Sequence, residues 1–235
     1  CDETAVAILE DGVRIRANLV ASQIAKHQPY GGVVPELASR CHTEVINVLM
    51  DKALKDAELK FKDLDAIAVT HGPGLVGALL VGLAAGKALA ASLSIPLIAV
   101  NHLRSHVYSN FISTKDSGPS TFLFPYLVLL VSGGHTQLIE MKSHTKLNII
   151  AETTDDAAGE AFDKVARLLE LGYPGGPAVQ KAAEQGNASA IKFKLSQGTE
   201  SFSFSGIKTA VSVYLKKNPD ANRFDIAASF QKSVV

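Results

Sequence analysis

Cysteine and net charge are both scarce in this sequence, and each scarcity narrows the possible class of protein. Two cysteines, Cys1 and Cys41, cannot form the disulfide framework of a secreted scaffold. Nothing in the chain reads as a secretory signal, so we expect a reducing, cytoplasmic location. Lysine plus arginine equals aspartate plus glutamate, at 23 each, so a nucleic-acid partner would need a local basic patch.

Long hydrophobic runs are also rare. Residues 75–93 are long enough to span a bilayer, but Lys87 interrupts them, and six alanines and three glycines dilute their hydrophobicity. We therefore expect a helix buried against a sheet, with Gly82 and Gly86 allowing close packing. Over 235 residues, 47% are apolar and 20% are charged, which is the composition of a globular protein.

The order of the predicted elements favours two α/β halves. In the first half, Asp11-Gly12 joins two alternating strands as a hairpin, and a helix follows from Val34. A strand over 64–74, a helix from Leu75 and a strand over 96–100 come next. Strands that alternate with helices predict a largely parallel sheet with crossover helices.

The second half follows the turn-forming residues 113–121, and we place the two lobes at 1–115 and 116–235. Its predicted strands and its amphipathic helix cover residues 124–131, 136–141, 146–153 and 159–171. Two hairpin-led halves predict a bilobal fold with a cleft. The last residues form a helical pattern without a stop signal, so we expect the natural protein to continue, with its C-terminal part missing from this sequence.

The segment LLVSGGHTQL, residues 129–138, carries the sharpest local signal. Gly133 and Gly134 stand between two apolar strands, where backbone N–H groups can converge on phosphate oxygens without a side chain in the way. Ser132 and Thr136 would add hydroxyl donors. An ordinary tight hairpin turn explains the same glycines, and the pattern alone favours the turn.

Four acids cluster around the start of the predicted second-lobe helix: Asp155, Asp156, Glu160 and Asp163. The spacing of the last three would place them on one helix face, where a cation or ligand could offset their repulsion. Solvated acids at a helix N-terminus are the alternative. The glycine turns in HGPGLVG, YPGGP and FSFSGIKT are anion sites or plain loops, and Lys208 in the last of them could meet an anion.

Two histidines, His102 and His106, stand four residues apart just after a predicted strand. On a helix this spacing puts both imidazoles on one face, as paired metal ligands require. Leu103 occupies the position where a zinc protease needs glutamate, so that class is excluded. The chain offers no obvious third ligand, and the spacing alone favours surface or capping histidines over a metal site.

Eight motifs in a fixed order are far more specific together than singly. They are CDET, YGGVVPELASRCH, THGPGLVGALLVG, NHLRSH, LLVSGGHTQL, DDAAGEAFDKVARLL, YPGGP and FSFSGIKT. The series resembles the universal tRNA threonylcarbamoyladenosine synthase family, in its metal-dependent subunit, over essentially the whole chain. The unbroken DDAAGEAFDK form and the lack of a fused kinase resemble the bacterial or organellar branch.

The resemblance implies an α/β fold of the actin, sugar-kinase and Hsp70 type (ASKHA), with two lobes and a nucleotide in the cleft. It also implies an acyltransferase that moves a threonylcarbamoyl group from threonylcarbamoyl-AMP to N6 of the adenosine 3′ of the anticodon, in tRNAs that read codons starting with A. The implied partners are tRNA with a metal-less paralogue and a small ATPase, or a second copy in the organellar case, and no membrane. The basic residues that could contact tRNA are Arg40, Arg104, Lys192, Lys194, Lys208, Lys216 and Lys217.

The resemblance also assigns the family's functional residues to positions in this sequence. His102 and His106 match its pair of metal ligands, for one divalent ion, Fe²⁺ or Zn²⁺. Its substrate-binding positions match Leu130, Val131, Ser132, Gly133, Gly134, Asp163 and Gly176. Asp2 and Glu3 fall near the family's site, its third metal ligand and adenine segment would lie beyond Val235, and no catalytic residue is assigned. As written, the chain is therefore expected to bind metal poorly and to be an inactive fragment of the enzyme.

The implied chemistry suits these residues. The mixed anhydride is already activated and AMP is a good leaving group, so the enzyme need only orient the anhydride, polarise its carbonyl and admit the amine. A metal on two imidazoles could polarise the carbonyl, and the glycine nest could offset the phosphate charge. Two alternatives stay open: a small-molecule kinase or ATPase of the same fold, and a non-catalytic scaffold paralogue.

Overall fold

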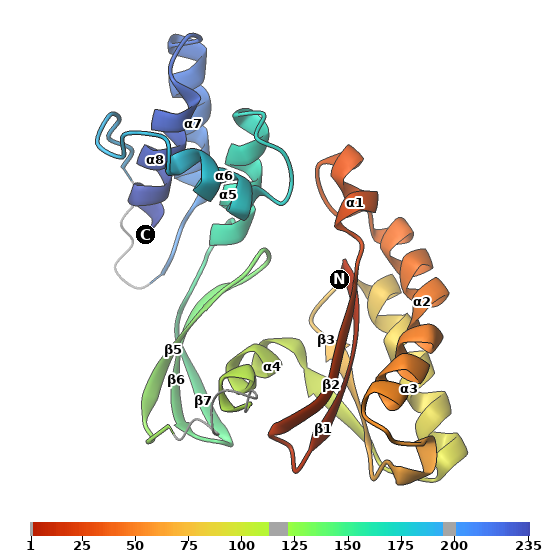
Figure 1. Ribbon diagram of the computed structural model, residues 1–235. Helices are drawn as coiled ribbons and strands as arrows, with labels where there is room; N and C mark the ends of the chain where they lie inside the picture. Colours follow the sequence, from red (N-terminus) through yellow and green to blue (C-terminus); the bar gives the residue numbers. More distant parts are fainter. Residues whose placement is uncertain (1, 113–121, 195–200) are drawn as a thin grey trace. The chain divides into compact units, whose positions relative to one another are not determined.

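The computed structural model describes residues 2–112, 122–194 and 201–235. The chain divides into two compact units, Cys1–Phe122 and Leu123–Val235 (Figure 1). The linker predicted over 113–121, and with it the predicted boundary after residue 115, lies outside the described residues.

The first unit opens with the predicted hairpin. Strands β1 (Glu3–Glu10) and β2 (Arg14–Ser22) pair antiparallel. Between them, Asp11 and Gly12 adopt φ angles of 53° and 71°, a region that aspartate and glycine enter more readily than other residues. The Asp-Gly signal is therefore confirmed as the hairpin turn.

Helices follow the hairpin and cover it. The short helices α1 (Ile24–His27) and η1 (Gln28–Tyr30) lead into α2 (Pro35–Asp56), and η2 (Phe61–Asp63) comes after it. Helix α2 begins at the predicted proline, because proline lacks an N–H and the first helical position does not need one. A small core of Ala17, Ala53 and Ala57 joins this helix to the hairpin.

The predicted crossover is confirmed as β3 (Ile67–Gly72), α3 (Val76–Leu93) and β4 (Leu97–Asn101), with β3 and β4 parallel. The prediction of one largely parallel sheet is wrong: in the described part of the chain, the antiparallel β1–β2 pair and the parallel β3–β4 pair are separate two-stranded sheets. The tight turn between β1 and β2 forces antiparallel pairing, and a parallel pair needs a crossover such as α3.

Helix α3 is long and apolar enough to cross a membrane by length and composition alone. In this structure it packs closely on the β3–β4 sheet, because a Cβ atom at Gly86 would lie 3.3 Å from Cβ of Val69. The predicted close packing at the glycines is confirmed. The helix is thus buried against a sheet as expected, but only along one stripe of small residues, Ala78, Gly86 and Ala90. The unit ends with α4 (His102–Tyr108) and η3 (Ser109–Phe111).

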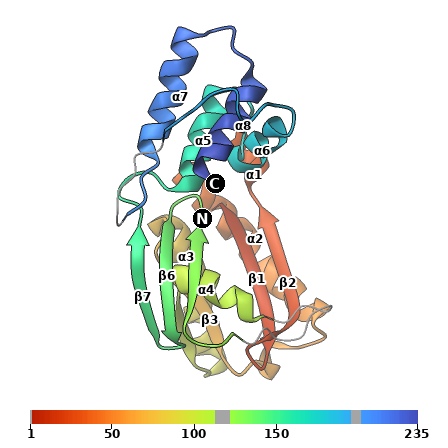
Figure 2. The same ribbon diagram turned by 90° about the vertical axis from the view of Figure 1, so that its left-hand side faces the viewer.

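The second unit is an antiparallel sheet with helices beyond one end of it (Figures 1 and 2). The strands β5 (Tyr126–Val131), β6 (Thr136–Ser143) and β7 (Lys146–Glu152) pair in that order. The helices are α5 (Ala158–Leu168), α6 (Gly175–Ala183), α7 (Ser205–Lys217) and α8 (Arg223–Val234). Their core includes the fully buried Val165, Leu169 and Phe230.

Two segments that read as loops begin helices instead. The YPGGP segment contains the start of α6 at Gly175, and FSFSGIKT contains the start of α7 at Ser205. The loop interpretation is wrong because proline and small residues occur at helix N-termini as well as in turns, and only the packing against α5 and α8 selects the helix.

Candidate metal and substrate sites

The carboxyl ends of β3 and β4 lie together in the first unit, where Gly72 pairs with Asn101. Strand β3 runs into the Gly72-Pro73-Gly74 turn, and β4 runs into α4. The Asn101 side chain caps α4, because its Oδ1 atom accepts hydrogen bonds from the backbone N atoms of Leu103 and Arg104 at 3.0 and 3.1 Å. Ligands of α/β proteins bind at this edge of a parallel sheet, so α4 starts where a site is expected.

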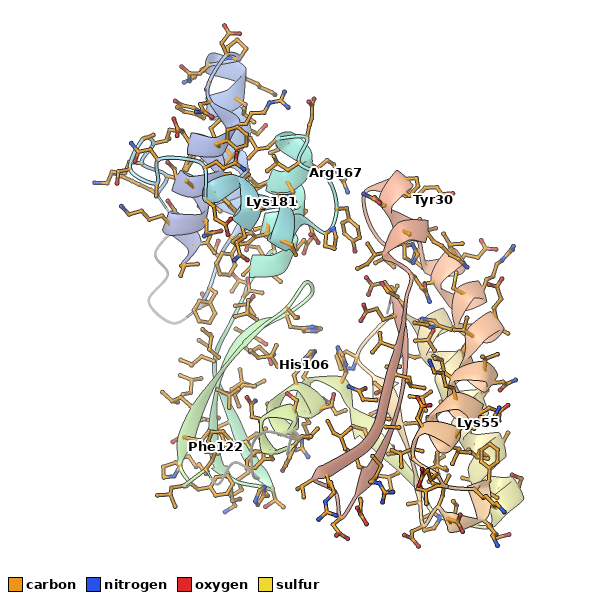
Figure 3. The ribbon with its side chains drawn as sticks, viewed as in Figure 1. Tyr30, Lys55, His106, Phe122, Arg167 and Lys181 are labelled. Carbon is orange, nitrogen blue, oxygen red and sulfur yellow. The ribbon has the colours of Figure 1, made fainter. Side chains whose placement is uncertain are left out.

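The two histidines of α4 face one another. Their Nε2 atoms lie 3.3 Å apart and their ring centroids 4.6 Å apart, and the imidazole of His106 projects from α4 (Figure 3). A tetrahedral zinc ion with Zn–N bonds of about 2.0–2.1 Å would hold two nitrogens about 3.3 Å apart. The pair thus fits two neighbouring positions on one metal ion, and a direct hydrogen bond between a protonated and a bare Nε2 also fits the distance.

Further ligands are not found near this pair. Within residues 2–112, 122–194 and 201–235, no group of three histidine, cysteine, aspartate or glutamate side chains could hold a metal ion. His102 and His106 could therefore supply two protein ligands to a metal ion, whose other coordination positions would fall to substrate, solvent or further protein groups. Asp2 and Glu3 lie at the start of β1 in the same unit, with Asp2 accepting a hydrogen bond from the Gln23 N–H through its carbonyl at 3.2 Å.

The glycine turn of the second unit connects β5 to β6 and is open above its glycines. Ser132 N donates to His135 O at 2.8 Å, and His135 N donates to Ser132 Oγ at 3.0 Å, which closes the turn. Neither Gly133 nor Gly134 has a positive φ, and a Cβ atom at either would meet nothing within 4 Å. Turn geometry therefore does not require glycine here, and the open space is available to a ligand.

The same turn sits on the first turn of α5. Gly159 N donates to Ser132 O at 3.2 Å, and Ala158 N donates to Thr136 Oγ1 at 2.9 Å. A Cβ atom at Gly159 would lie 2.6 Å from Ser132 O, so glycine is required for this close approach. The Ser132 and Thr136 hydroxyls predicted as ligand donors are thus engaged by protein groups.

The remaining implied substrate residues are linked to this turn through α5. Asp163, on α5, accepts a hydrogen bond from Gly175 N at 2.8 Å, which joins α5 to the start of α6. A Cβ atom at Gly175 would collide with the Asp163 backbone, whereas one at Gly176 would meet nothing within 4 Å. Leu130 is 5% exposed and its side chain belongs to the core, so only its backbone could meet a ligand.

The acidic cluster does not share one helix face. Asp156 precedes α5 and pairs with Lys164 at 2.7 Å and with Lys208 at 3.0 Å. Burial alone would raise the pKa of Asp156, but the two lysines outweigh it and lower that pKa. The hydrogen bond that Lys164 donates to Asp156, followed by the one that it donates to Glu160, raises the pKa of Lys164. Of the two alternatives, an acidic face open to a cation does not hold for Asp156, because Lys164 and Lys208 neutralise its charge inside the unit.

Asp155 has a structural role that the sequence did not reveal. Its carboxylate accepts hydrogen bonds from Ser203 Oγ at 2.5 Å, from Phe204 N at 2.8 Å and from Ser205 N at 3.3 Å, at the start of α7. Burial raises the pKa of Asp155, and these three hydrogen bonds together lower it further than burial raises it. Asp155 therefore caps α7 from nearly fifty residues away along the chain.

A buried polar network in the first unit was also missed. Thr4 Oγ1 and His42 Nδ1 lie 2.7 Å apart, Gln23 Nε2 lies 3.3 Å from the same nitrogen, and His27 Nε2 lies 3.1 Å from Gln23 Oε1. Burial lowers the pKa of His42, so the network contains a neutral imidazole. The HTE segment of α2 gave no periodic signal that could have revealed it.

Comparison with known proteins shows that the chain is similar to transferases that modify tRNA. Residues 14–235 match the family tRNA N6-adenosine threonylcarbamoyltransferase (TsaD). The enzyme of that name from Clostridium kluyveri is 52% identical over 243 residues, and the one from Clostridium perfringens is 53% identical over 242. Each alignment covers 100% of this chain and 70% of the relative. The chain belongs to the tRNA N6-adenosine threonylcarbamoyltransferase family.

Two solved structures also match, both from Pseudomonas aeruginosa. YeaZ is 15% identical with a TM-score of 0.38, and the match covers 67% of this chain and 63% of YeaZ. An uncharacterised protein similar to the peptidase YEAZ is 13% identical with a TM-score of 0.41, over 94% of this chain and 91% of that one. The family membership confirms the α/β class, the resemblance and the transferase activity predicted from the motifs.

Proposed function

We propose that this chain carries the site that transfers threonylcarbamoyl from threonylcarbamoyl-AMP to N6 of the adenosine 3′ of the anticodon, in tRNAs that read codons starting with A. The observation that carries the proposal is the open glycine turn seated on α5, in a chain 52% identical to a curated enzyme of this activity. In the reaction the bond between the carbamoyl carbon and the phosphate oxygen breaks, a bond to N6 forms, and AMP and the amine proton leave.

The glycine turn would hold the phosphate of the adenylate. A Cβ atom at Gly133 or Gly134 would meet nothing within 4 Å, so a phosphate can approach the backbone of this turn, and the N-terminus of α5 adds the positive end of a helix dipole beside it. The same contacts stabilise the negative charge that develops on AMP as it leaves. Asp163 and Gly176 complete the proposed adenylate site.

His102 and His106 would hold one divalent ion, Fe²⁺ or Zn²⁺, in the first unit. The 3.3 Å separation of their Nε2 atoms fits that role, and the Asn101 cap fixes the helix that carries them. When bound, the ion supplies a Lewis acid for the threonylcarbamoyl carbonyl. The histidines themselves orient this site by holding both imidazoles on one helix face.

We expect tRNA binding to need partner subunits, in the cytoplasm and away from membranes. Zero net charge gives little long-range attraction for a polyanion, and two of the seven basic candidates are already paired. Lys208 binds Asp156 at 3.0 Å, and Arg40 binds Glu36 at 2.6 Å. The proposed partners are a metal-less paralogue and a small ATPase, or a second copy of the chain in the organellar case.

One face of the first unit suits a protein partner. A groove runs between α2 and α3, and Val48, Val76 and Leu80 on these helices are 65%, 71% and 55% exposed. The groove is lined by Thr43, Ile46, Asn47, Leu80, Val81 and Ala84. We propose that one of the protein partners covers this mostly apolar face, because burial of apolar area drives protein–protein association.

The test is formation of threonylcarbamoyladenosine by the full-length protein with its partners, threonylcarbamoyl-AMP and a tRNA transcript, measured by mass spectrometry of the digested tRNA. We expect modification by the wild type and by His144→Ala, a control outside the proposed sites, and loss of it in His102→Ala. Titration of tRNA against the lone protein should show weak, salt-sensitive binding. Phosphorylation of a small metabolite from ATP without tRNA would identify the kinase alternative and refute the proposal.

A further inference from the structure

Thr136 is not one of the substrate-binding residues that the family resemblance implies. It nevertheless connects the glycine turn to α5, and both of these carry such residues. Its side chain is 3% exposed, so the protein itself surrounds the hydroxyl. Oγ1 accepts the hydrogen bond from Ala158 N, the first residue of α5, at 2.9 Å. Its carbonyl accepts another from Thr153 N at 3.0 Å. The residue that leaves the glycine turn is therefore fixed on both its side-chain and its backbone oxygen.

Ser132, where the chain enters the glycine turn, is hydrogen-bonded to the first helical turn of α5. Ser132 O accepts from Gly159 N at 3.2 Å, and the absence of a side chain at Gly159 permits the contact. Gly133 and Gly134 lie between these two anchors. Two hydrogen bonds, one at each end, thus define where the open glycines stand relative to α5, which also carries Asp163.

We propose that Thr136 is a positioning residue for the transfer reaction, whose hydroxyl holds the Gly133–Gly134 segment in register with the N-terminus of α5. The proposal rests on the proposed function. Ala158 N and Gly159 N are used to hold the turn, so the helix contributes the positive end of its dipole. That dipole stabilises a phosphate at the glycines only if the turn stays against the N-terminus of α5. Without the Thr136 hydrogen bond every proposed ligand group is still present, but the glycine turn and α5 can shift apart. A misplacement of about 1 Å can lower the rate about 100-fold.

Thr136→Val is the direct test, because valine keeps the branched shape and removes the oxygen that accepts from Ala158 N. Thr136→Ser keeps the oxygen and is the matched rescue, and Thr145→Val, an exposed threonine in the β6–β7 turn, is the remote control. The measurements are the Kd for AMP by calorimetry, and kcat and KM for threonylcarbamoyl-AMP and for tRNA separately. All use the full-length protein with its partners.

A second variant removes the same hydrogen bond by deleting its donor rather than its acceptor. Ala158→Pro deletes the N–H donor at the first position of α5, where proline is accepted, and Ala157 already has the extended ψ of 158° that a residue before proline prefers. If Thr136→Val does not fold, Ala158→Pro keeps the proposal testable. Thermal melts of each variant, measured first, set a temperature at which all remain folded.

We expect Thr136→Val and Ala158→Pro each to raise the Kd for AMP and the KM for threonylcarbamoyl-AMP about tenfold, the effect of one lost hydrogen bond. The KM for tRNA should not change, and Thr136→Ser should stay within about twofold of the wild type. A wild type that neither binds AMP nor modifies tRNA would overturn the proposed function itself. A working wild type with an unchanged adenylate KM in Thr136→Val, or equal losses in the valine and serine variants, would overturn the positioning role alone.

Discussion

Replacing Asp156 by asparagine should destabilise the second unit more than any other change to its acidic cluster. The Asp156 side chain is 15% exposed and lies between Lys164 and Lys208, which are 33% and 28% exposed. Asparagine keeps the shape and removes the charge, so two lysines that shared a counterion are left close together. Lys164 retains only Glu160, at 2.8 Å.

The size of the effect follows from how buried these groups are. Hydrogen bonds to charged groups contribute about 1.5–3 kcal/mol each, and breaking a fully buried pair costs about 3–5 kcal/mol. Because both lysines keep about a third of their exposure, solvent reduces the loss, and we expect the free energy of unfolding to fall by about 2–3 kcal/mol. That loss corresponds to a decrease in Tm of about 5–10 °C for a chain of this size.

Urea unfolding of the wild type, Asp156→Asn and Glu160→Gln measures this effect. Glu160 binds the same Lys164 but is 44% exposed, so its replacement should cost no more than about 0.5 kcal/mol. Because the pKa of Asp156 is lowered in the folded protein, its stabilisation is present above the ordinary value of 3.8 and is lost as the pH falls below it. Equal unfolding energies for the two variants at neutral pH, or a difference that persists in strong acid, would refute the reasoning.

Burial lowers the pKa of His42 from its ordinary value of 6.5, so as the pH falls the unfolded chain takes up a proton at this residue before the folded chain does. The free energy of unfolding should therefore decrease from pH 7 to pH 5. Urea unfolding at several pH values should show a smaller decrease for His42→Gln. Replacing either His102 or His106 by alanine should lower the metal content of the full-length protein by at least half in elemental analysis, and unchanged stoichiometry in both would exclude the pair as ligands. Gly133→Ala should keep the wild-type Tm yet lose affinity for AMP in calorimetry, because the space above it is open. Gly159→Ala should lower the Tm itself, because a Cβ there meets the Ser132 carbonyl; a normal Tm would contradict that contact.

Features that depend on neighbouring residues could be predicted from the sequence. The Asp-Gly pair places φ angles of 53° and 71° where the hairpin turns, because few other residues tolerate them. Pro35 starts α2 for the same kind of local reason. Spacing of four residues on one helix brings His102 and His106 within 3.3 Å, since the geometry of a single helical turn decides it.

The pairing of polar groups that are far apart in the sequence depends on how the helices pack. Asp156 and Lys208 are 52 residues apart in sequence and 3.0 Å apart in space, and no local pattern signals such a pair. Gly159 N, at the start of α5, likewise donates a hydrogen bond to the carbonyl of Ser132, which lies 27 residues earlier in the sequence. Side chains pair across such distances because packing of the α5–α8 core brings their backbones together, and a pattern within one segment carries no information about that packing.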